Sequence, residues 1–362
     1  MKWKYLIIFV LLVSIFPIGI YFYFQNRYQK IVVTPSSEIK ISPLPTPTQD
    51  PDKAFSILLL GYAGYGHDGG FLTDSIILAR INPKLREIDL ISLPRDLWVK
   101  FPETVIASHW AKINSAYAVG IDDKKYPNKA IEFTGKAGGG EMSKYLVSTV
   151  TGIKPDYFMA IDFSGFIKAI DQLGGIDINM PKTYDDEFYP LDIGATDLCG
   201  KGDEEIKALS ATMSGDKLDQ QFTCRYEHLH FDKGFVHLDG ATALKYARSR
   251  HSLTDGSDFN RSQRQRLVIE AIKNKVISIN FFGKIIPVIK TLSSHLTTDI
   301  SFETMESYLI RAPEFSQYKI NSLAITDQNY LKMGVSSDRQ SILMPILGEN
   351  NYTDIQNFLR YN

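Results

Sequence analysis

Short runs of apolar residues mark the start of the folded part of the chain, near residue 54. The first run, FSILLLG at residues 55–61, is bounded by glycine and predicts a buried strand. Two similar runs, DSIILARIN and REIDLISLP, follow it, and Pro83 and Lys84 between them suit a turn. This pattern predicts a hairpin that feeds a central sheet.

Helical and strand patterns alternate farther along the chain. A helical run around EMSKYLVSTVTG precedes a strand, YFMAIDF, and a second helix, SGFIKAIDQLGG, ends in glycines that suit a C-cap. IDINMP predicts another strand. Such alternation predicts an α/β domain, and we expect a three-layer α/β/α sandwich around a central mixed sheet, preceded by one transmembrane helix.

Residues 182–235 break the alternation because they are rich in Asp, Glu and Gly, and we interpret them as an insertion. After the insertion, Asp239 can cap a short helix, and Asp258 can cap a longer one, FNRSQRQRLVIEAIKNKVIS. Beyond Ser278 the signals are weak. We expect a catalytic domain over residues 54–300 and a C-terminal extension, residues 301–362, packed on it.

Two segments precede the predicted domain. Tyr5–Phe24 is twenty residues without a charge, long enough to cross a bilayer core of ~30 Å as a helix. The lysines before it favour a cytoplasmic N-terminus, and its aromatic end favours a retained anchor over a cleaved signal peptide. We expect residues 1–30 to be a cytoplasmic tip and membrane anchor, and residues 31–53, with five prolines, to be an extended linker.

Amino-acid composition adds one feature to these predictions, a stretch rich in arginine. The net charge of −1 and the 44% hydrophobic content are ordinary for a globular protein. Residues 248–266, RSRHSLTDGSDFNRSQRQR, nevertheless hold five of the 13 arginines and none of the 27 lysines. A guanidinium binds phosphate or carboxylate through a rigid fork of donors. The stretch therefore predicts a local anion site, and the balanced charge argues against a coat for nucleic acid.

Spacing within the stretch refines this prediction. Arg261, Arg264 and Gln265 share one face of the predicted helix with an apolar stripe. An arginine in the first turn faces the positive end of the helix dipole, which is unfavourable unless an anion binds there. Arg248 and Arg250 alternate and would point the same way on an extended segment. The alternative is that Arg264 and its neighbours face solvent or pair with nearby aspartates.

Further charged residues follow the predicted strands. Arg95 and Asp96 come directly after the third strand, where site residues of α/β folds are common, although Arg95 could simply pair with Glu87. Lys112 is another candidate cation. The glycine-rich loop at 61–74 lacks the GK[ST] ending of a P-loop, but its Asp74 suits a Mg²⁺ ion held against a diphosphate.

The two cysteines, Cys199 and Cys224, both lie in the insertion. A disulfide and two free thiols are both compatible with the sequence. A zinc site that adds His228 and His230 fits no strong spacing pattern, since His-x-His is also typical of the exposed side of a strand.

Seven stretches, in order, resemble the LytR-CpsA-Psr family of bacterial envelope proteins. The resemblance implies a membrane-anchored phosphotransferase that moves a glycopolymer from a polyprenyl diphosphate carrier to a peptidoglycan or other envelope acceptor, with Mg²⁺ or Mn²⁺. It also implies an apolar tunnel for the polyprenyl chain. The stretches, which span roughly residues 55–276, are ILLLG, TDSIILARINP, ISLPRDLWV, KINSAYAVG, YFMAIDFSGFIKAIDQLGGIDINMP, HLDGATALKYARSR and DFNRSQRQR.

The resemblance implies roles for single residues. Asp74 matches a metal-binding aspartate that the family needs for catalysis. Lys112 and Asp96 match frequent motif positions and, with Arg264, complete the predicted substrate-binding set. The positions that bind pyrophosphate in the family are matched by Arg95, Arg248, Arg250, Arg261 and Gln265.

The chain departs from the family pattern at two positions, where Ala63 replaces an aspartate and Leu72 replaces an arginine. We offer Asp68, or else His67, as the substitute metal ligand because the loop carries it close to Asp74.

Two other functions use the same features. Water as acceptor would make the chain a polyprenyl diphosphate phosphatase, and a non-enzymatic envelope-binding or transcription-attenuating module is the second alternative. The chain has no DNA-reading helix motif, so we expect no nucleic-acid partner. We expect a single-pass protein of the bacterial cell membrane with its catalytic domain extracellular.

Overall fold

The computed structural model forms two compact units, Met1–Leu173 with Val276–Asn362 (unit 1) and Gly174–Lys275 (unit 2). The predicted membrane anchor, Tyr5–Phe24, lies outside the residues that the structure describes. No helix within the described residues is long and apolar enough to cross a bilayer. The described residues are 25–26, 28–34, 53–67, 69–103, 105, 109–191, 196–250, 252, 256–278, 288, 292 and 294–361.

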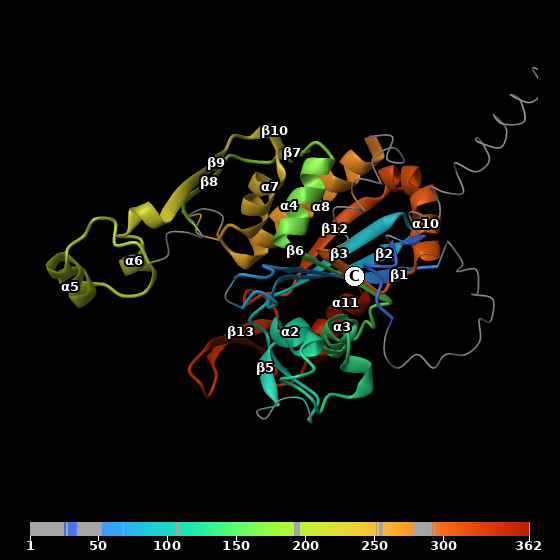
Figure 1. The fold of residues 1–362 in the computed structure, drawn as a ribbon, viewed down its shortest axis with the longest axis horizontal. Helices are drawn as coiled ribbons and strands as arrows, with labels where there is room; N and C mark the ends of the chain where they lie inside the picture. Colours follow the sequence, from blue (N-terminus) through green and yellow to red (C-terminus); the bar gives the residue numbers. More distant parts are fainter. Residues whose placement is uncertain are drawn as a thin grey trace, which may run out of the picture. The chain divides into compact units, whose positions relative to one another are not determined.

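A six-stranded sheet forms the centre of unit 1. Its strands are β1 (Phe55–Tyr62), β2 (Thr73–Asn82), β3 (Glu87–Leu93), β6 (Tyr157–Asp162), β11 (Leu296–Thr298) and β12 (Lys319–Ala324), in the order β11-β6-β1-β2-β3-β12 (Figure 1). The sheet is mixed because β1 runs parallel to β6 and antiparallel to β2. The predicted hairpin is confirmed, since Asn82 of β2 pairs with Glu87 of β3.

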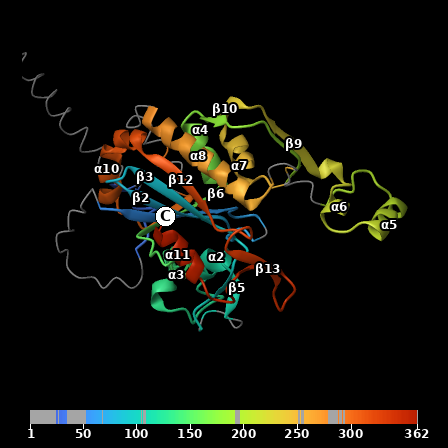
Figure 2. The ribbon, with the colours of Figure 1, turned by 180° about the vertical axis from the view of Figure 1, so that it is seen from behind.

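Helices cover both faces of this sheet (Figures 1 and 2). α2 (Ser115–Ile121), α3 (Gly138–Thr151) and α11 (Thr353–Tyr361) lie on one face, and α4 (Phe163–Gln172) and α10 (Phe302–Ile310) lie on the other. The predicted α/β fold with a central mixed sheet is thereby confirmed. Unit 1 also contains β4 (Trp98–Lys100), β5 (Trp110–Lys112), β13 (Leu331–Val335), β14 (Ser341–Pro345) and two short 3₁₀ helices, Ile131–Phe133 and Ala312–Gln317.

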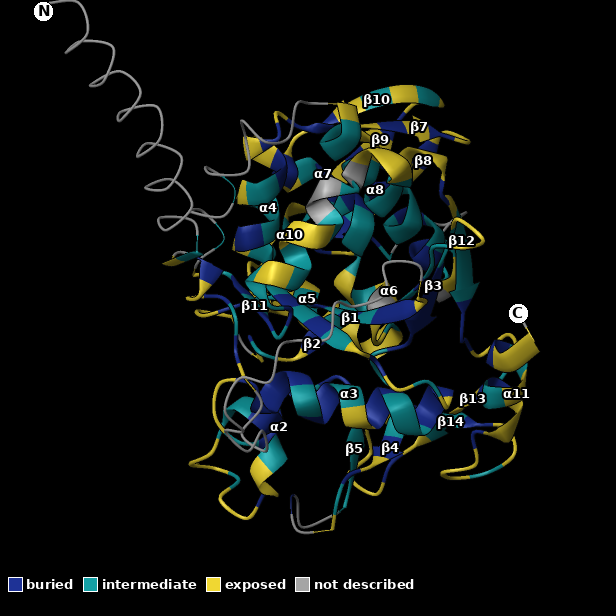
Figure 3. Cartoon of the chain, turned by 90° about the vertical axis from the view of Figure 1, so that its right-hand side faces the viewer, coloured by how far each residue is buried: buried dark blue, intermediate teal, exposed yellow. Residues whose placement is uncertain are grey.

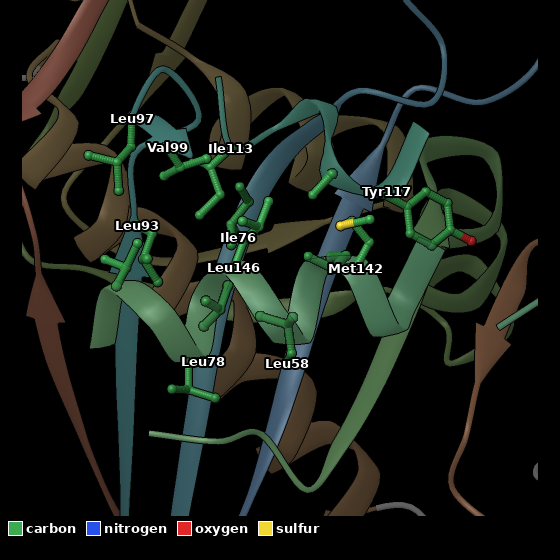
Figure 4. Close-up of a cluster of buried hydrophobic side chains, with 14 of the residues drawn as sticks. Leu58, Ile76, Leu78, Leu93, Leu97, Val99, Ile113, Tyr117, Met142 and Leu146 are labelled. Carbon is green, nitrogen blue, oxygen red and sulfur yellow. The ribbon is translucent and has the colours of Figure 1, made fainter. Parts of the chain in front are cut away.

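The main core of unit 1 lies between α3 and the sheet. Figure 4 shows Met142 and Leu146 of α3 pointing toward the strands, where they meet Leu58, Ile76 and Leu78. Figure 3 marks the same layer by its buried residues. Because burial of these side chains removes apolar surface from water, it holds α3 firmly on the strands whose ends carry the candidate site.

α3 begins with three glycines, Gly138–Gly140, that precede the predicted helical run. A Cβ atom on Gly140 would lie 2.2 Å from the ring of Phe158 on β6, so no larger residue fits between helix and sheet there. Glycine lowers helix propensity by about 1 kcal/mol relative to alanine. Close packing on β6 therefore overrides local propensity at the start of this helix.

Unit 2 contains two antiparallel ladders. β7 (Ile176–Met180) pairs with β10 (Gly234–Leu238), and β8 (Tyr184–Pro190) pairs with β9 (Tyr226–Phe231). The β8–β9 ladder leads to α5 (Asp203–Thr212) and α6 (Asp216–Asp219), as Figures 1 and 2 show. Cys199 and Cys224, in the same region, are joined in a disulfide, which decides between the two states that the sequence left open.

Two helices complete unit 2. α7 (Gly240–Arg248) begins as predicted, since the carboxylate of Asp239 accepts a hydrogen bond from the Thr242 amide at 2.8 Å. α8 (Asp258–Ser278) differs from the prediction, because Asp258 is already its first residue. The hydroxyl of Ser257, one residue earlier, accepts from the Asn260 amide at 3.2 Å and acts as the cap.

Candidate functional site

Asp74 stands at an irregularity in the pairing of β1 with β2. Gly61 pairs with Ser75 and Tyr62 pairs with Thr73, so Asp74 is opposite no residue of β1. A bulge of this kind adds a residue to one strand and re-aims its side chain. The bulge thus explains how a residue within a buried strand presents its carboxylate at the end of the sheet.

Arg95 lies just beyond β3 and binds this carboxylate. The β2–β3 ladder pairs Ile76 with Leu93, and continuing its register by two residues places Asp74 opposite Arg95. Nη1 of Arg95 donates to Oδ1 of Asp74 at 2.5 Å. The two side chains are 36% and 28% exposed, so a ligand from solvent can reach both.

Asp96 and Lys112 extend this pair. Nε of Arg95 lies 3.5 Å from Oδ2 of Asp96, and Nζ of Lys112 donates to Oδ1 of Asp96 at 2.7 Å. Lys112 is the last residue of β5, and the Asp96 carbonyl accepts from the Leu343 amide at 3.0 Å. The structure therefore brings together four residues that the sequence singled out. We call Asp74, Arg95, Asp96 and Lys112 the charged row.

The charged row keeps Arg95 cationic. Burial lowers the pKa of the Arg95 guanidinium, but the hydrogen bond and negative charge of Asp74, with the charge of Asp96, outweigh it and raise that pKa. Among the described residues Arg95 binds these two carboxylates and not Glu87, so the simpler pairing is wrong. A phosphate offers the same oxygen geometry as a carboxylate and can replace one on the guanidinium.

The Arg95 loop is also held by its backbone. The Asn114 amide donates to the Arg95 carbonyl at 3.3 Å, and the Ile113 amide donates to the Leu97 carbonyl at 2.8 Å. The Asn114 carbonyl in turn accepts from the Thr73 amide at 3.0 Å. These bonds join β2, the Arg95 loop and the start of α2 into one rigid support.

The arginine stretch belongs to unit 2, where Arg248 ends α7 and residues 258–266 form the start of α8. The sequence predicted that Arg248 and Arg250 would point the same way on an extended segment. This is wrong for Arg248, which is the last residue of helix α7. Ser249, which follows, is buried, whereas Arg248 and Arg250 are half-buried. The helix continues through Arg248 because the backbone carbonyl of Lys245 accepts a hydrogen bond from the Ser249 amide.

The predicted face of α8 is present. Arg261 and Arg264 are buried together with Val268, and Gln265 is half-buried beside them. Polar and apolar residues thus share the buried side of the helix, as the spacing predicted.

Arg264 is fully buried, with 1% of its surface exposed. Its Nε donates to the Tyr246 carbonyl at 3.1 Å and its Nη2 donates to the Ser249 carbonyl. These contacts tie α8 to the end of α7 and favour a structural role for Arg264. Arg266 pairs with Glu270 one turn later, at 3.0 Å.

The proposed substitute ligand Asp68 lies outside the described residues. Asp162 lies beside the same loop and was not among the predicted site residues. A Cβ atom on Gly64 would be 3.2 Å from the Cβ of Asp162. Its carboxylate accepts from the Gly165 amide at 2.7 Å and lies 2.9 Å from Nδ1 of His295. An aspartate directly before a helical run was the available signal, and it indicates a helix cap.

Known proteins resemble the chain over most of its length. A sequence model of the LytR_cpsA_psr family matches residues 19–350. The polyisoprenyl-teichoic acid–peptidoglycan teichoic acid transferase TagV of Bacillus subtilis is 27% identical over 76% of this chain, and this chain spans only 57% of TagV. The transferase of the same description, TagU, from Enterococcus faecalis is 26% identical over 79% of this chain and 74% of its own length.

A solved structure agrees with the fold. Protein gbs0355 from Streptococcus agalactiae superposes with a TM-score of 0.56 at 25% identity. The match covers 85% of this chain and 87% of that one.

Proposed function

The chain belongs to the LytR-CpsA-Psr family, and on that basis we propose that it is a phosphotransferase acting on a polyprenyl diphosphate carrier. It would move the attached glycopolymer to peptidoglycan or another envelope acceptor. The names of the TagV and TagU relatives, which describe a polyisoprenyl-linked donor and a peptidoglycan acceptor, support both substrates.

The observation that carries this proposal is the charged row. Arg95 and Lys112 are half-exposed cations fixed at one end of a rigid sheet, each bound to a carboxylate. Phosphoryl transfer requires little covalent chemistry from a protein and depends on positioning and charge neutralisation. Arg95 and Lys112 are suited to bind the phosphate oxygens of a diphosphate.

Asp74 is a suitable ligand for the proposed Mg²⁺ or Mn²⁺. Mg²⁺ is commonly held by one or two carboxylates together with substrate phosphates. Within the described part of the chain, Arg95 contacts Oδ1 of Asp74, so Oδ2 could hold a cation. When bound, the ion would neutralise charge on the diphosphate. Asp68 remains the proposed second ligand.

We propose that an acceptor sugar hydroxyl attacks the phosphorus that bears the glycopolymer. A new P–O bond forms, the bridging P–O bond of the diphosphate breaks, and polyprenyl phosphate leaves as the hydroxyl proton is released. Arg95 and Lys112 hold phosphate oxygens through this step. The remaining residues that the family motifs predict to bind the diphosphate are Arg248, Arg250, Arg261 and Gln265.

The location of the chain is part of the proposal. Tyr5–Phe24 would anchor it in the bacterial cell membrane with the N-terminus cytoplasmic. The expected linker, residues 31–53, does not separate the domain from this segment, because Ile31 and Val33 are buried in unit 1 and the Val33 amide donates to the Thr298 carbonyl at 2.7 Å. The donor, which carries a polyprenyl chain, would then meet the domain at the bilayer. The lipid would occupy an apolar tunnel, as the resemblance implies.

A transfer assay tests this function. The full chain would be incubated with a polyprenyl diphosphate-linked glycopolymer and Mg²⁺, with or without peptidoglycan. Acceptor-linked polymer supports the transferase. Polymer released to water in both arms would indicate a phosphatase, and binding without turnover would indicate a non-enzymatic module. We expect Arg248→Ala to lose turnover, with circular dichroism confirming its fold.

A further inference from the structure

Three side chains of unit 2 meet across the β8–β9 ladder, which Figure 1 shows as two neighbouring strands. Asp185 of β8 pairs with His230 of β9 in the antiparallel register. His228 is two residues before His230 and therefore points to the same face of the strand. All three side chains are exposed to solvent.

The polar atoms of these side chains converge. Oδ1 of Asp185 contacts Nε2 of His228 and lies 3.5 Å from Nδ1 of His230. One ligand atom from each residue lies within 4.8 Å of the other two. The ladder pairs Asp185 with His230, and His228 lies on the same strand as His230, so the three possible metal ligands are held close together by the strands that carry them.

We propose that Asp185, His228 and His230 form a binding site for a divalent transition-metal ion of the Zn²⁺ class. Imidazole nitrogen and carboxylate oxygen are both ordinary zinc ligands, and two imidazoles select against Mg²⁺, which prefers oxygen. Three protein ligands leave a fourth tetrahedral position for water. The site lies in unit 2 and shares no residue with the charged row or with the residues proposed to bind the diphosphate.

A fourth residue supports the site from outside. Oδ1 of Asp232 lies 3.5 Å from Nε2 of His230, the ring nitrogen that does not face Asp185. A metal-binding histidine commonly has a carboxylate at its other ring nitrogen, which fixes the tautomer and the ring orientation. His230 is therefore arranged as a metal ligand with an outer carboxylate.

A second histidine–aspartate pair in the same unit differs in one respect. His237 of β10 faces Asp177 of β7, with Nδ1 and Oδ1 2.7 Å apart, and both are exposed. This pair offers two ligand atoms, one fewer than the Asp185 group. It provides the matched control for an ordinary surface ion pair.

Cysteine does not take part in this site. Cys199 and Cys224 lie within ligand distance of Asp197, but their sulfurs are joined to each other and offer no thiolate. The ion would instead link β8 to β9 next to the irregularity in their register between Asp186 and Tyr189. Metal binding would thus stabilise the ladder at the place where its hydrogen bonding is interrupted.

Zn²⁺ titration of the full chain, without a polyhistidine tag and against a chromophoric chelator, tests the site. We expect one Zn²⁺ per chain, unaffected by excess Mg²⁺. His228→Ala should weaken binding more than about tenfold, because outer-shell partners alone typically contribute roughly 10–100-fold. Asp185→Asn should also weaken it, whereas His237→Ala and Asp177→Asn should bind as the wild type does.

The opposite results would overturn the proposal. These are the absence of stoichiometric Zn²⁺ binding by the wild type, unchanged affinity in both His228→Ala and Asp185→Asn, or an equal loss in His237→Ala. Circular dichroism of each variant checks that the fold is kept. Since the four side chains compared are exposed and each lies on a strand of an antiparallel pair, a loss limited to the Asp185 group reports ligation.

Discussion

Arg95 is the residue on which the charged row depends, because it contacts two carboxylates at once. It binds Asp74 at 2.5 Å and lies 3.5 Å from Asp96. A diphosphate would compete with both carboxylates for the N–H donors of Arg95. Once Arg95 binds the diphosphate, Asp74 would lose its ion-pair partner. The exchange would leave the Asp74 carboxylate available to the proposed metal ion.

Lys112→Ala should reduce turnover by roughly 10–100-fold, because a hydrogen bond to a charged group contributes about 1.5–3 kcal/mol and each 1.4 kcal/mol is a factor of ten. Lys100→Ala is the matched control, since Lys100 lies at the other end of the β4–β5 ladder and pairs with exposed Glu103 at 3.6 Å. Initial rates of polymer transfer measure both. Equal rates in the two variants would remove Lys112 from the site.

Arg264→Ala should lower the free energy of unfolding by about 3 kcal/mol, because two buried carbonyls, of Tyr246 and Ser249, each lose a donor worth about 1–3 kcal/mol. Arg266→Ala should cost only about 0.5 kcal/mol, since its pair with Glu270 is half-exposed. Urea unfolding of both variants measures the difference. A stable Arg264→Ala protein with lost turnover would instead assign Arg264 to substrate binding.

The sequence predicted the β2–β3 hairpin but not its exact register. A two-residue turn at Pro83 and Lys84 would place Asp74 opposite Leu93, whereas the observed pairing of Asn82 with Glu87 leaves a four-residue turn and places Asp74 opposite Arg95. The bulge at Asp74 was not predicted, because Gly61, which lies at the register shift on β1, was interpreted only as the end of the first strand. The sequence also did not predict the hydrogen bonds that allow Arg264 to be buried, because their acceptors are backbone carbonyls at the end of the folded α7.

At the level of elements, α3 joins the sheet more closely than its sequence suggests. Gly140→Ala should destabilise the chain, although alanine is the better helix former by about 1 kcal/mol, because overpacking against Phe158 costs about 1–3 kcal/mol. Thermal unfolding measures the sign. Gly202→Ala, which meets no atom within 4 Å, is the control and should change stability by less than about 1 kcal/mol. A stabilised Gly140→Ala protein would contradict the packing.

The disulfide closes a loop between residues 25 positions apart in the insertion. Cys199→Ser with Cys224→Ser should destabilise this region by up to about 3.5 kcal/mol through the entropy of the opened loop. Hydrogen exchange over residues 196–225 measures the effect. We expect faster exchange there and unchanged exchange in β1–β3, and equal exchange in both forms would show that other contacts hold the loop.

Elements with a strong local signal were the ones that the sequence predicted. Apolar runs identified β1, β2 and β3, and Asp239 identified the start of α7. The first turn of α3 was not predicted, because its glycines are required by close packing against the sheet and not by local helix propensity. β12 was missed for a related reason, since its parallel pairing with β3 joins residues more than 230 positions apart. Local patterns do not encode such pairings.

The whole molecule has almost no net charge, yet positively charged candidate site residues occur in both units. The net charge is −1, yet each unit carries its own concentration of cations, Arg95 and Lys112 in unit 1 and the arginine stretch in unit 2. Family membership over residues 19–350 includes both units. We therefore expect substitutions in either unit to affect polymer transfer, while the proposed zinc site affects only the stability of its ladder.

The transfer of labelled glycopolymer from a polyprenyl diphosphate donor to peptidoglycan, by the wild type and by Asp74→Asn, tests the central claim most directly. The substitution keeps the shape of the side chain and removes the charge that binds Arg95 and the proposed metal ion. We predict Mg²⁺-dependent, acceptor-linked product with the wild type and a loss of at least about 100-fold in the variant. Equal transfer by a folded Asp74→Asn protein, or transfer that persists after chelation of all divalent metal, would contradict the account.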